Sequence, residues 1–291
     1  MDSVGSVFGR PPQHTLPVGE ACPNCATTLA GPWCHACGQS SEDFHRSIVR
    51  LAAEAIGGLV DVDSRIWRTL PNLCLRPARL TRAYLDGHRV TQAPPFRLFL
   101  IVVVLVFLVA GLGRGSDVTN FRFEDGSGHV LAGPGGPSVS VAARPRTAFG
   151  QWVEARLQAA AKNPARFQAA LIEWAQRLAF LTLPIAAALL GISFVFRRGV
   201  YLFDHLIFSM HSLSFQGLLL STVMLAGLLT DWSGWLMLLS PVHLFVHLRG
   251  TYRIGVFGTL ARMTFLFAGS AFAMMLVLSG LVFIGLYEVG A

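Results

Sequence analysis

Five long stretches of the chain contain no charged residue, and they constrain the fold more than any other feature. They run over residues 98–113, 178–196, 205–230, 232–248 and 263–287. A helix needs about 20 apolar residues to cross the hydrocarbon core of a bilayer. The sequence therefore predicts an all-α membrane protein that contains a bundle of about five transmembrane helices.

Two of the five stretches are weaker candidates than the others. The first is short, but Arg97 and Arg114 flank it, and long basic side chains can extend from the ends of a short span to the membrane surface. The fourth contains Pro241, His243 and His247. A re-entrant or buried segment is the alternative to a complete span for residues 232–248.

The overall composition agrees with a membrane protein. Hydrophobic residues make up 53% of the chain and charged residues 13%, whereas about a quarter of the residues of a soluble domain are charged. The net charge of +7 comes mainly from arginines beside the apolar stretches, where the membrane surface accounts for them. We therefore expect the lipid bilayer as a partner, and no nucleic acid.

The arginines near the spans predict the orientation. They precede the first span, follow the second and separate the fourth from the fifth, which places them all on one side. The opposite side carries Asp231 and Glu288, and the first twenty residues lack the apolar core of a signal peptide. We expect a multi-pass protein of the bacterial inner (plasma) membrane, with the N-terminus cytoplasmic and the C-terminus extracytoplasmic.

The first two spans are joined by a long extracytoplasmic loop, residues 114–177. Within it, residues 121–131 alternate around a glycine turn, which predicts a small hairpin, and residues 132–146 form a Gly/Pro-rich linker. Apolar residues then recur at helical spacing between Trp152 and Trp174, with a break at Asn163-Pro164. We predict two amphipathic helices that lie on the outer membrane surface, or that form a packed cap over the bundle.

The segment before the first span contains short helices on the cytoplasmic side. Residues 1–21 are predicted to be a flexible N-terminus, and residues 41–95 to form cytoplasmic or interfacial helices. One helix covers residues 42–60 with Ser41 as its cap, and a second has an apolar stripe made of Ile66, Trp67, Leu70 and Leu73. A third begins at Pro77 and closes at Gly87.

Four of the five cysteines lie close together near the N-terminus, in a CxxC-x8-CxxC pattern. They are Cys22, Cys25, Cys34 and Cys37. Four thiolates on two facing turns satisfy tetrahedral zinc, so residues 22–39 are predicted to form a zinc ribbon with a structural metal. With a structural zinc, His35 is a bystander. A redox CxxC pair is the alternative. Cys74 is expected to be a small buried or interfacial residue.

A second group of polar residues lies inside the apolar stretches. The third span contributes Asp204, His205, Ser209, His211 and Ser212, and the fourth contributes His243 and His247. Polar side chains in a membrane helix are costly, so they predict a site by default. The alternatives are a second metal or a haem, a proton relay, or hydrogen bonds that hold the helices together.

Motifs of known enzyme classes do not identify a reaction. The chain contains no GxSxG elbow, no HExxH sequence and no P-loop. We therefore name no catalytic residue, and a non-enzymatic role is favoured.

Several separated motifs are shared with one family. They are Cys22-Pro-Asn-Cys25 with Trp33 to Gln39, Arg76-Pro77 with Tyr84 to Arg89, Pro94-Pro95, Asp204 to Ser212, and Leu248 to Tyr252. In these motifs the chain resembles the bacterial zinc-ribbon membrane proteins catalogued as domain of unknown function 3667. The resemblance implies a polytopic membrane protein with a cytosolic ribbon and implies no activity. It includes His205 and His211 but not His243 and His247, which favours a role for the first pair alone.

Three functions are consistent with the sequence. The first is a scaffold or regulatory membrane module that engages a cytoplasmic or membrane protein partner through the zinc ribbon. The second is a small transporter, or a protein that handles protons or metal ions, which uses Asp204, His205 and His211. The third is a membrane metalloenzyme or haem protein, which requires a second metal.

Overall fold

The computed structural model describes residues 16, 18–41, 65–112, 122–125, 130–132, 138–141, 147–197 and 199–289, with the backbone alone for the three short strands. The chain divides into two compact units. Unit 1 comprises Met1–Ile101, Phe196–Phe215 and Pro241–Thr259, and unit 2 comprises Val102–Val195, Gln216–Ser240 and Leu260–Ala291. The predicted helix at 42–60 and most of the predicted flexible N-terminus lie outside the described residues.

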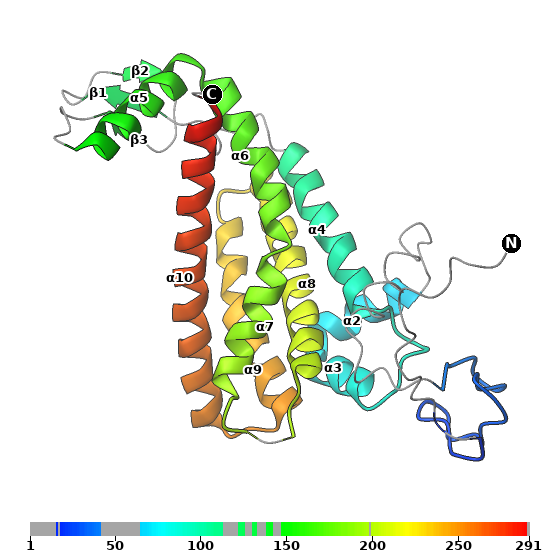
Figure 1. Cartoon of the computed structure of the whole chain (residues 1–291). Coiled ribbons are helices and arrows are strands. Elements are labelled where there is room, and N and C mark those ends of the chain that lie inside the picture. Colours follow the sequence, from blue (N-terminus) through cyan, green and yellow to red (C-terminus); the bar gives the residue numbers. More distant parts are fainter. Residues whose placement is uncertain are drawn as a thin grey trace, which may run out of the picture. The chain divides into compact units, whose positions relative to one another are not determined.

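The described part of the chain is mostly helical (Figure 1). In order, the elements are α2 (Arg65–Leu75), α3 (Pro77–Leu85), α4 (Pro95–Leu112), β1 (Arg122–Asp125), β2 (Val130–Ala132), β3 (Ser138–Val141), α5 (Ala148–Lys162), α6 (Pro164–Ala179), α7 (Thr182–Ser193), α8 (Leu202–Gly227), the 3-10 helix η4 (Ser233–Leu238), α9 (Leu239–Tyr252) and α10 (Val256–Val289).

Among the described residues, three helices are long and apolar enough to cross a membrane. They are α4, α8 and α10, with 18, 26 and 34 residues. They coincide with the predicted spans at 98–113, 205–230 and 263–287, so these three candidates are confirmed as long apolar helices. At 1.5 Å per residue, each reaches close to or beyond the roughly 30 Å of a hydrocarbon core.

The second predicted span, residues 178–196, is not one straight helix. Helix α7 has 12 residues, or about 18 Å, which is too short to cross alone. It becomes long enough only together with α6, at a bend of 46°. The bend has a local cause, since Pro184 lacks the N–H that would bond to Phe180 in a continuous helix and its ring would meet that carbonyl.

The fourth predicted span, residues 232–248, is divided between η4 and α9. Helix α9 has 14 residues and is not among the helices long enough to cross. Pro241 lies in its first turn, where a missing N–H costs little. Ring contacts pair Phe215 with His243, Phe208 with His247, and His205 with Tyr252. Residues later in α8 therefore contact residues earlier in α9, so the two helices are antiparallel.

In unit 2, helices α5 and α6 pack against α10. Phe167 and Ala160 are buried with Leu286 and Val289, and Gly285 leaves room for Phe167. The predicted pair of helices with a break at Asn163-Pro164 is confirmed. Their contact with α10 supports the packed arrangement rather than two helices that contact lipid alone.

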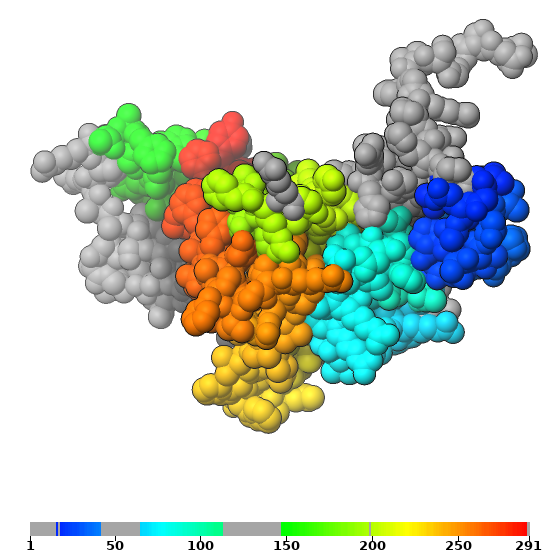
Figure 2. Space-filling view, turned by 90° about the horizontal axis from the view of Figure 1, so that it is seen from below, coloured from blue at the N-terminus to red at the C-terminus, as the bar shows by residue number. Residues whose placement is uncertain are grey.

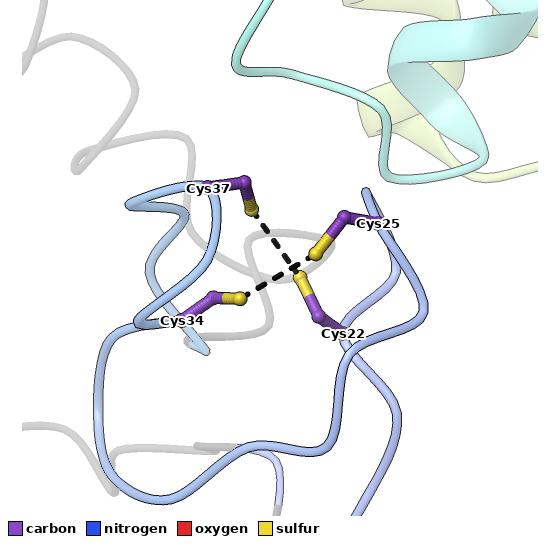
Figure 3. Close-up of side chains that lie close together, drawn as sticks. All are labelled: Cys22, Cys25, Cys34 and Cys37. Atoms are coloured by element: carbon purple, nitrogen blue, oxygen red, sulfur yellow. Dashed lines mark hydrogen bonds between the residues drawn. The ribbon is translucent and has the colours of Figure 1, made fainter.

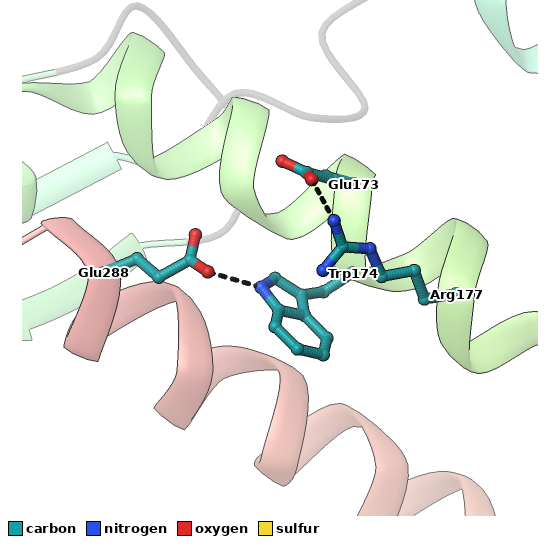
Figure 4. A network of polar contacts seen from close by, with 4 residues as sticks. All are labelled: Glu173, Trp174, Arg177 and Glu288. Atoms are coloured by element: carbon teal, nitrogen blue, oxygen red, sulfur yellow. Dashed lines mark hydrogen bonds and ion pairs between the residues drawn. The ribbon is translucent and has the colours of Figure 1, made fainter.

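A polar network joins the same two helices near the end of the chain. Trp174 donates from Nε1 to Oε1 of Glu288 at 2.7 Å, and Arg177 pairs with Glu173 along α6 (Figure 4). The guanidinium of Arg177 also lies over the Trp174 ring, 4.8 Å from its centre. The indole N–H is bonded to Glu288 and the indole ring lies against Arg177, which fixes the C-terminal half of α6 against α10.

The long loop contains a small three-stranded sheet with the order β2-β1-β3. Strands β1 and β2 are antiparallel, which confirms the predicted hairpin. Strand β3 pairs in parallel with β1, although residues 132–146 were predicted to be a linker. The alternation Ser-Val-Ser-Val over Ser138–Val141 suits a strand, and the glycines and prolines around it conceal this signal.

In unit 1, helices α2 and α3 confirm the two predicted short helices. Helix α2 buries Ile66, Thr69 and Leu73, while Trp67 is 72% exposed. The predicted stripe was wrong about Trp67, because position 67 is turned about 100° away from Ile66 around the helix. Helix α3 begins with Pro77 at its first position, as expected for proline.

Candidate functional site

The four predicted cysteine ligands meet in the ribbon of unit 1. Each CxxC sequence forms a tight turn, in which Ala26 donates to Cys22 O and Gly38 donates to Cys34 O, both at 2.8 Å. Ala26 and Gly38 have positive φ, at 60° and 73°. The second turn uses glycine, for which this conformation is free of strain. The two turns are therefore repeats of one local structure.

The thiols converge to a spacing that suits a metal ion. Cys22 Sγ lies 3.7 Å from Cys37 Sγ, and Cys25 Sγ lies 3.5 Å from Cys34 Sγ (Figure 3). All four sulfurs lie within 4.8 Å of one another. In a tetrahedral site with Zn–S bonds of about 2.3 Å, neighbouring sulfurs are about 3.8 Å apart. The four cysteines can hold one metal ion, and the geometry is compatible with zinc.

The ribbon is longer than the predicted 22–39. Leu16 N–H donates to Ser41 O at 2.8 Å, and the backbones of Gly19 and Glu20 bond to Leu29. Leu29 is 1% exposed and packs with Cys22 and Cys34. The ordered ribbon thus includes residue 16 and residues 18–41 and has one buried leucine beside the metal-binding cysteines.

The environment of the thiols differs between the two turns. Hydrogen bonds from the side chain and the backbone of Thr27 lower the pKa of Cys25 to about 6. Burial raises the pKa of Cys37 to about 11. Partial burial also raises the pKa of Cys74. In the absence of a metal ion, Cys25 therefore loses its proton at a lower pH than Cys37 or Cys74.

The second turn of the ribbon is attached to the loop that follows α3. Gln39 is buried, its Nε2 donates to Gly87 O at 2.9 Å, and its Oε1 accepts from Arg89 N at 3.4 Å. Figure 2 shows the ribbon surface, in blue, against the cyan surface of residues 65–95. Gly87 has φ +96°, and a Cβ there would lie 2.8 Å from Cβ of Pro23. The close approach of the ribbon to this loop thus requires glycine.

Two of the predicted histidines meet at a residue that sequence reasoning missed, Thr81 of α3. Thr81 Oγ1 lies 2.9 Å from His211 Nδ1 and 2.8 Å from His247 Nε2. The three residues are at most 1% exposed. A hydroxyl has one proton, so Thr81 donates to one imidazole and accepts from the other. His211 and His247 thus share one hydrogen-bond partner, although the family motifs include His211 and leave His247 out.

The other two histidines have separate partners. His205 Nδ1 lies 2.8 Å from the hydroxyl of Tyr252. His243 donates from Nε2 to Leu73 O at 2.9 Å, and its ring stacks on Phe215 with the ring centres 3.5 Å apart. The cluster joins α2 and α3 to α8 and α9 through side chains that are all buried.

The remaining predicted polar residues lie at the margins of the cluster. Asp204 Oδ2 accepts from Tyr201 N at 2.9 Å, so this carboxylate caps the start of α8. Ser209 is 1% exposed, and its hydroxyl has no hydrogen-bond partner among the described residues. Ser212 is half-buried.

The structure does not gather these residues into a second metal site. Within the described ranges, the four cysteines form the only group of three or more His, Cys, Asp or Glu side chains that could hold a metal ion. The histidines instead bond to a threonine, a tyrosine and a backbone carbonyl. This arrangement supports hydrogen bonding between helices over coordination of a metal or a haem.

In the comparison with known proteins, one family model matches α2, α3 and most of α4, which includes Thr81 and Leu73 but not the histidines of α8 and α9. The family described as "Protein of unknown function (DUF3667)" matches residues 63–107. The chain thus carries a DUF3667 segment. The match confirms the family that the motifs indicate, and the segment contains α2, α3, Thr81 and Gly87. No curated protein and no solved structure matches the chain.

The residues that sequence reasoning missed have no local signal of their own. Thr81 lies inside the DUF3667 segment, between two motif stretches, and a threonine in a short helix is unremarkable. Tyr252 ends the motif Leu248 to Tyr252, and Gln39 ends the ribbon motif. The family motifs thus lie next to or include Thr81, Tyr252 and Gln39. The hydrogen-bond partners of these three residues, however, are 47 to 166 residues away in sequence.

Proposed function

We propose that the protein is a scaffold or regulatory module of the bacterial inner membrane, in which a zinc ribbon is fixed to a membrane-embedded helical bundle and presents a surface to a partner protein. In this proposal the zinc has a structural role, because four thiolates leave no position open for a substrate. The chain needs no reaction of its own to perform this function.

One observation carries the proposal, the connection from the ribbon to the buried histidines. Gln39 joins the second metal-binding turn to Gly87 and Arg89. The helix before this loop is α3, whose Thr81 bonds to His211 and His247. The ribbon, whose fold depends on the metal in this proposal, is therefore connected through one short helix to buried histidines of α8 and α9. Such a connection suits a module whose membrane part and ribbon respond to one another.

The topology belongs to the same proposal. Helix α9 returns antiparallel to α8, so the chain reverses its direction between them even though α9 is short. Counting η4 with α9 as one pass and α6 with α7 as another gives five passes. The arginines beside the spans then favour a cytoplasmic N-terminus and ribbon, and an extracytoplasmic C-terminus.

The experiment that tests this function is crosslinking and affinity capture of the tagged full chain from its own membranes. Cys34→Ser, which removes a metal ligand, is compared with Cys74→Ser, which removes a thiol outside the ribbon. We expect that the captured partners are lost with Cys34→Ser and retained with Cys74→Ser. Retention of every partner by Cys34→Ser, together with loss of the cellular phenotype in His211→Ala, would contradict the scaffold function.

A second function, proton or ion handling by the buried cluster, is favoured by unpaired polar atoms. Ser209 Oγ and His247 Nδ1 are buried without a partner within the described part of the chain. Buried polar atoms of this kind line ion pathways in membrane proteins. Proteoliposomes that contain wild type or His211→Ala would be compared for proton and metal-ion flux. Equal flux in the two preparations would exclude this function.

A further inference from the structure

One polar cavity of unit 1 is not explained by the scaffold function. It has a volume of about 250 Å³ and lies where three helix ends meet. Its lining comprises Arg82 and Leu85 of α3, Arg197, Gly199, Val200 and Asp204 around the start of α8, and Thr251, Tyr252 and Arg253 at the end of α9. Ligand pockets for drug-sized molecules start at about 300 Å³, so this cavity suits a small group.

The charge of the lining selects an anion. The lining contains three arginines and one carboxylate, a formal charge of +2, which the ion pair of Arg82 with Asp86 outside the lining reduces to +1. The carboxylate is that of Asp204, whose Oδ2 already accepts from Tyr201 N. The cavity also adjoins the N-terminus of α8, a helix of 26 residues. The N–H groups and the dipole of a helix N-terminus both favour negative charge.

Two buried polar atoms of residues that line the cavity have no hydrogen-bond partner among the described residues. Thr251 is 2% exposed, and its Oγ1 forms no hydrogen bond within the described ranges. Arg82 uses Nη2 for Asp86 at 2.8 Å, while its Nε is buried without a partner in the same part of the chain. Buried donors are rarely left unsatisfied. An anion with several oxygens in the cavity would accept from both.

We propose that this cavity, defined by Arg82, Arg197 and Arg253 with Thr251, binds a phosphate group. Arginine is the residue best suited to phosphate, because its planar fork of donors matches the phosphate oxygens. The phosphate group belongs either to the headgroup of an anionic lipid or to a soluble phosphate compound. The site is separate from the ribbon and goes beyond the proposed scaffold function.

The test is binding to the reconstituted full chain. Wild type is placed in nanodiscs of phosphatidylcholine alone, titrated with inorganic phosphate, and in nanodiscs of phosphatidylcholine mixed with phosphatidylglycerol. The thermal unfolding midpoint is the readout. A rise with inorganic phosphate in neutral lipid assigns a soluble ligand, and a rise with phosphatidylglycerol alone assigns a lipid headgroup.

The variants decide whether the cavity is responsible. Arg253 has φ +50°, so Arg253→Asn removes the charge and keeps a residue that tolerates this backbone. Loss of a charged hydrogen bond predicts at least about tenfold weaker binding. Arg68→Gln removes an exposed arginine of α2 outside the cavity and should leave binding unchanged. A midpoint that does not rise for wild type, or equal behaviour of the two variants, would overturn the proposal.

A third variant separates binding from folding. Thr251→Val keeps the shape of the side chain and removes a buried hydroxyl that has no partner. The ligand-free protein should be as stable as wild type or more stable, because the cost of the unpaired hydroxyl disappears. The rise caused by ligand should be smaller than in wild type. A rise equal to that of wild type would place the ligand elsewhere.

Discussion

Replacing Thr81 by valine tests the buried junction between α3, α8 and α9. Valine keeps the volume and the β-branch of threonine, so neither a cavity nor a change in helix preference is expected. The substitution removes the hydroxyl that lies 2.9 Å from His211 and 2.8 Å from His247. Two imidazole nitrogens are then buried without a partner.

The magnitude follows from the cost of these two nitrogens. A buried polar group without a partner costs about 1–3 kcal/mol, which gives about 2–6 kcal/mol for the pair. Hydrogen bonds between membrane helices average less, about 0.6 kcal/mol. We therefore expect Thr81→Val to lower the free energy of unfolding by about 2 kcal/mol, near the lower end of that range.

The chain offers a matched control in Thr259. It is also fully buried in a helix, but its hydroxyl donates to Gly255 O, a carbonyl that also accepts from the Thr259 backbone N–H. Thr259→Val therefore leaves no group without a partner and should cost about 0.5 kcal/mol. Thr81→Ser keeps the hydroxyl and should recover most of the loss.

The assay is unfolding of the full chain in mixed micelles with increasing dodecyl sulfate, followed by circular dichroism. The reasoning requires that Thr81→Val loses clearly more stability than Thr259→Val. Equal losses for the two valine variants would refute it, because the bridge to the histidines would then contribute no more than an ordinary bond to the helix backbone.

Two further predictions concern packing and the thiols. A Cβ at Gly250 would lie 2.4 Å from Cβ of Ala78, whereas a Cβ at Gly280 would have no atom within 4 Å. Gly250→Ala should therefore lower the free energy of unfolding by about 1–2 kcal/mol. Gly280→Ala should raise it by up to about 1 kcal/mol, because alanine is the better helix former. A loss in both would contradict the close approach of α3 and α9. In metal-free protein the pKa of Cys25 is about 6, so the reactive thiolate is present above that pH. Cys25 should therefore react with iodoacetamide at neutral pH. Mass spectrometry across a pH series should find half-maximal alkylation near pH 6. A midpoint at the ordinary value near 9 would contradict the influence of Thr27.

Local sequence patterns predicted the local parts of the structure. The CxxC spacing placed Cys22, Cys25, Cys34 and Cys37 around one point, because each turn is formed by neighbouring residues. Uncharged stretches of sufficient length predicted α4, α8 and α10, because length and hydropathy decide whether a helix can cross. The break at Asn163-Pro164 was also predicted, because proline interrupts the helix in which it lies and its effect is therefore local.

The parts that sequence did not predict depend on tertiary contacts. The sequence placed His211 and His247 at compatible depths, but the residue between them, Thr81, is 130 and 166 positions away. Hydropathy counts also treated 178–196 and 232–248 as single helices. Pro184 and Pro241 mark where the observed helices begin, but a proline in a membrane span is compatible with a bend as well as with a break.

The central claim is that the metal-bound ribbon is structurally joined to the DUF3667 segment. Hydrogen exchange of the full chain, with zinc and after chelation, tests it most directly, with elemental analysis to establish that the metal has been removed. The peptide that covers residues 84–93 should exchange faster without metal, because Gln39 no longer holds Gly87 and Arg89, and residues 270–285 of α10 should be unchanged. Unaltered exchange over 84–93 in the metal-free protein would contradict the account.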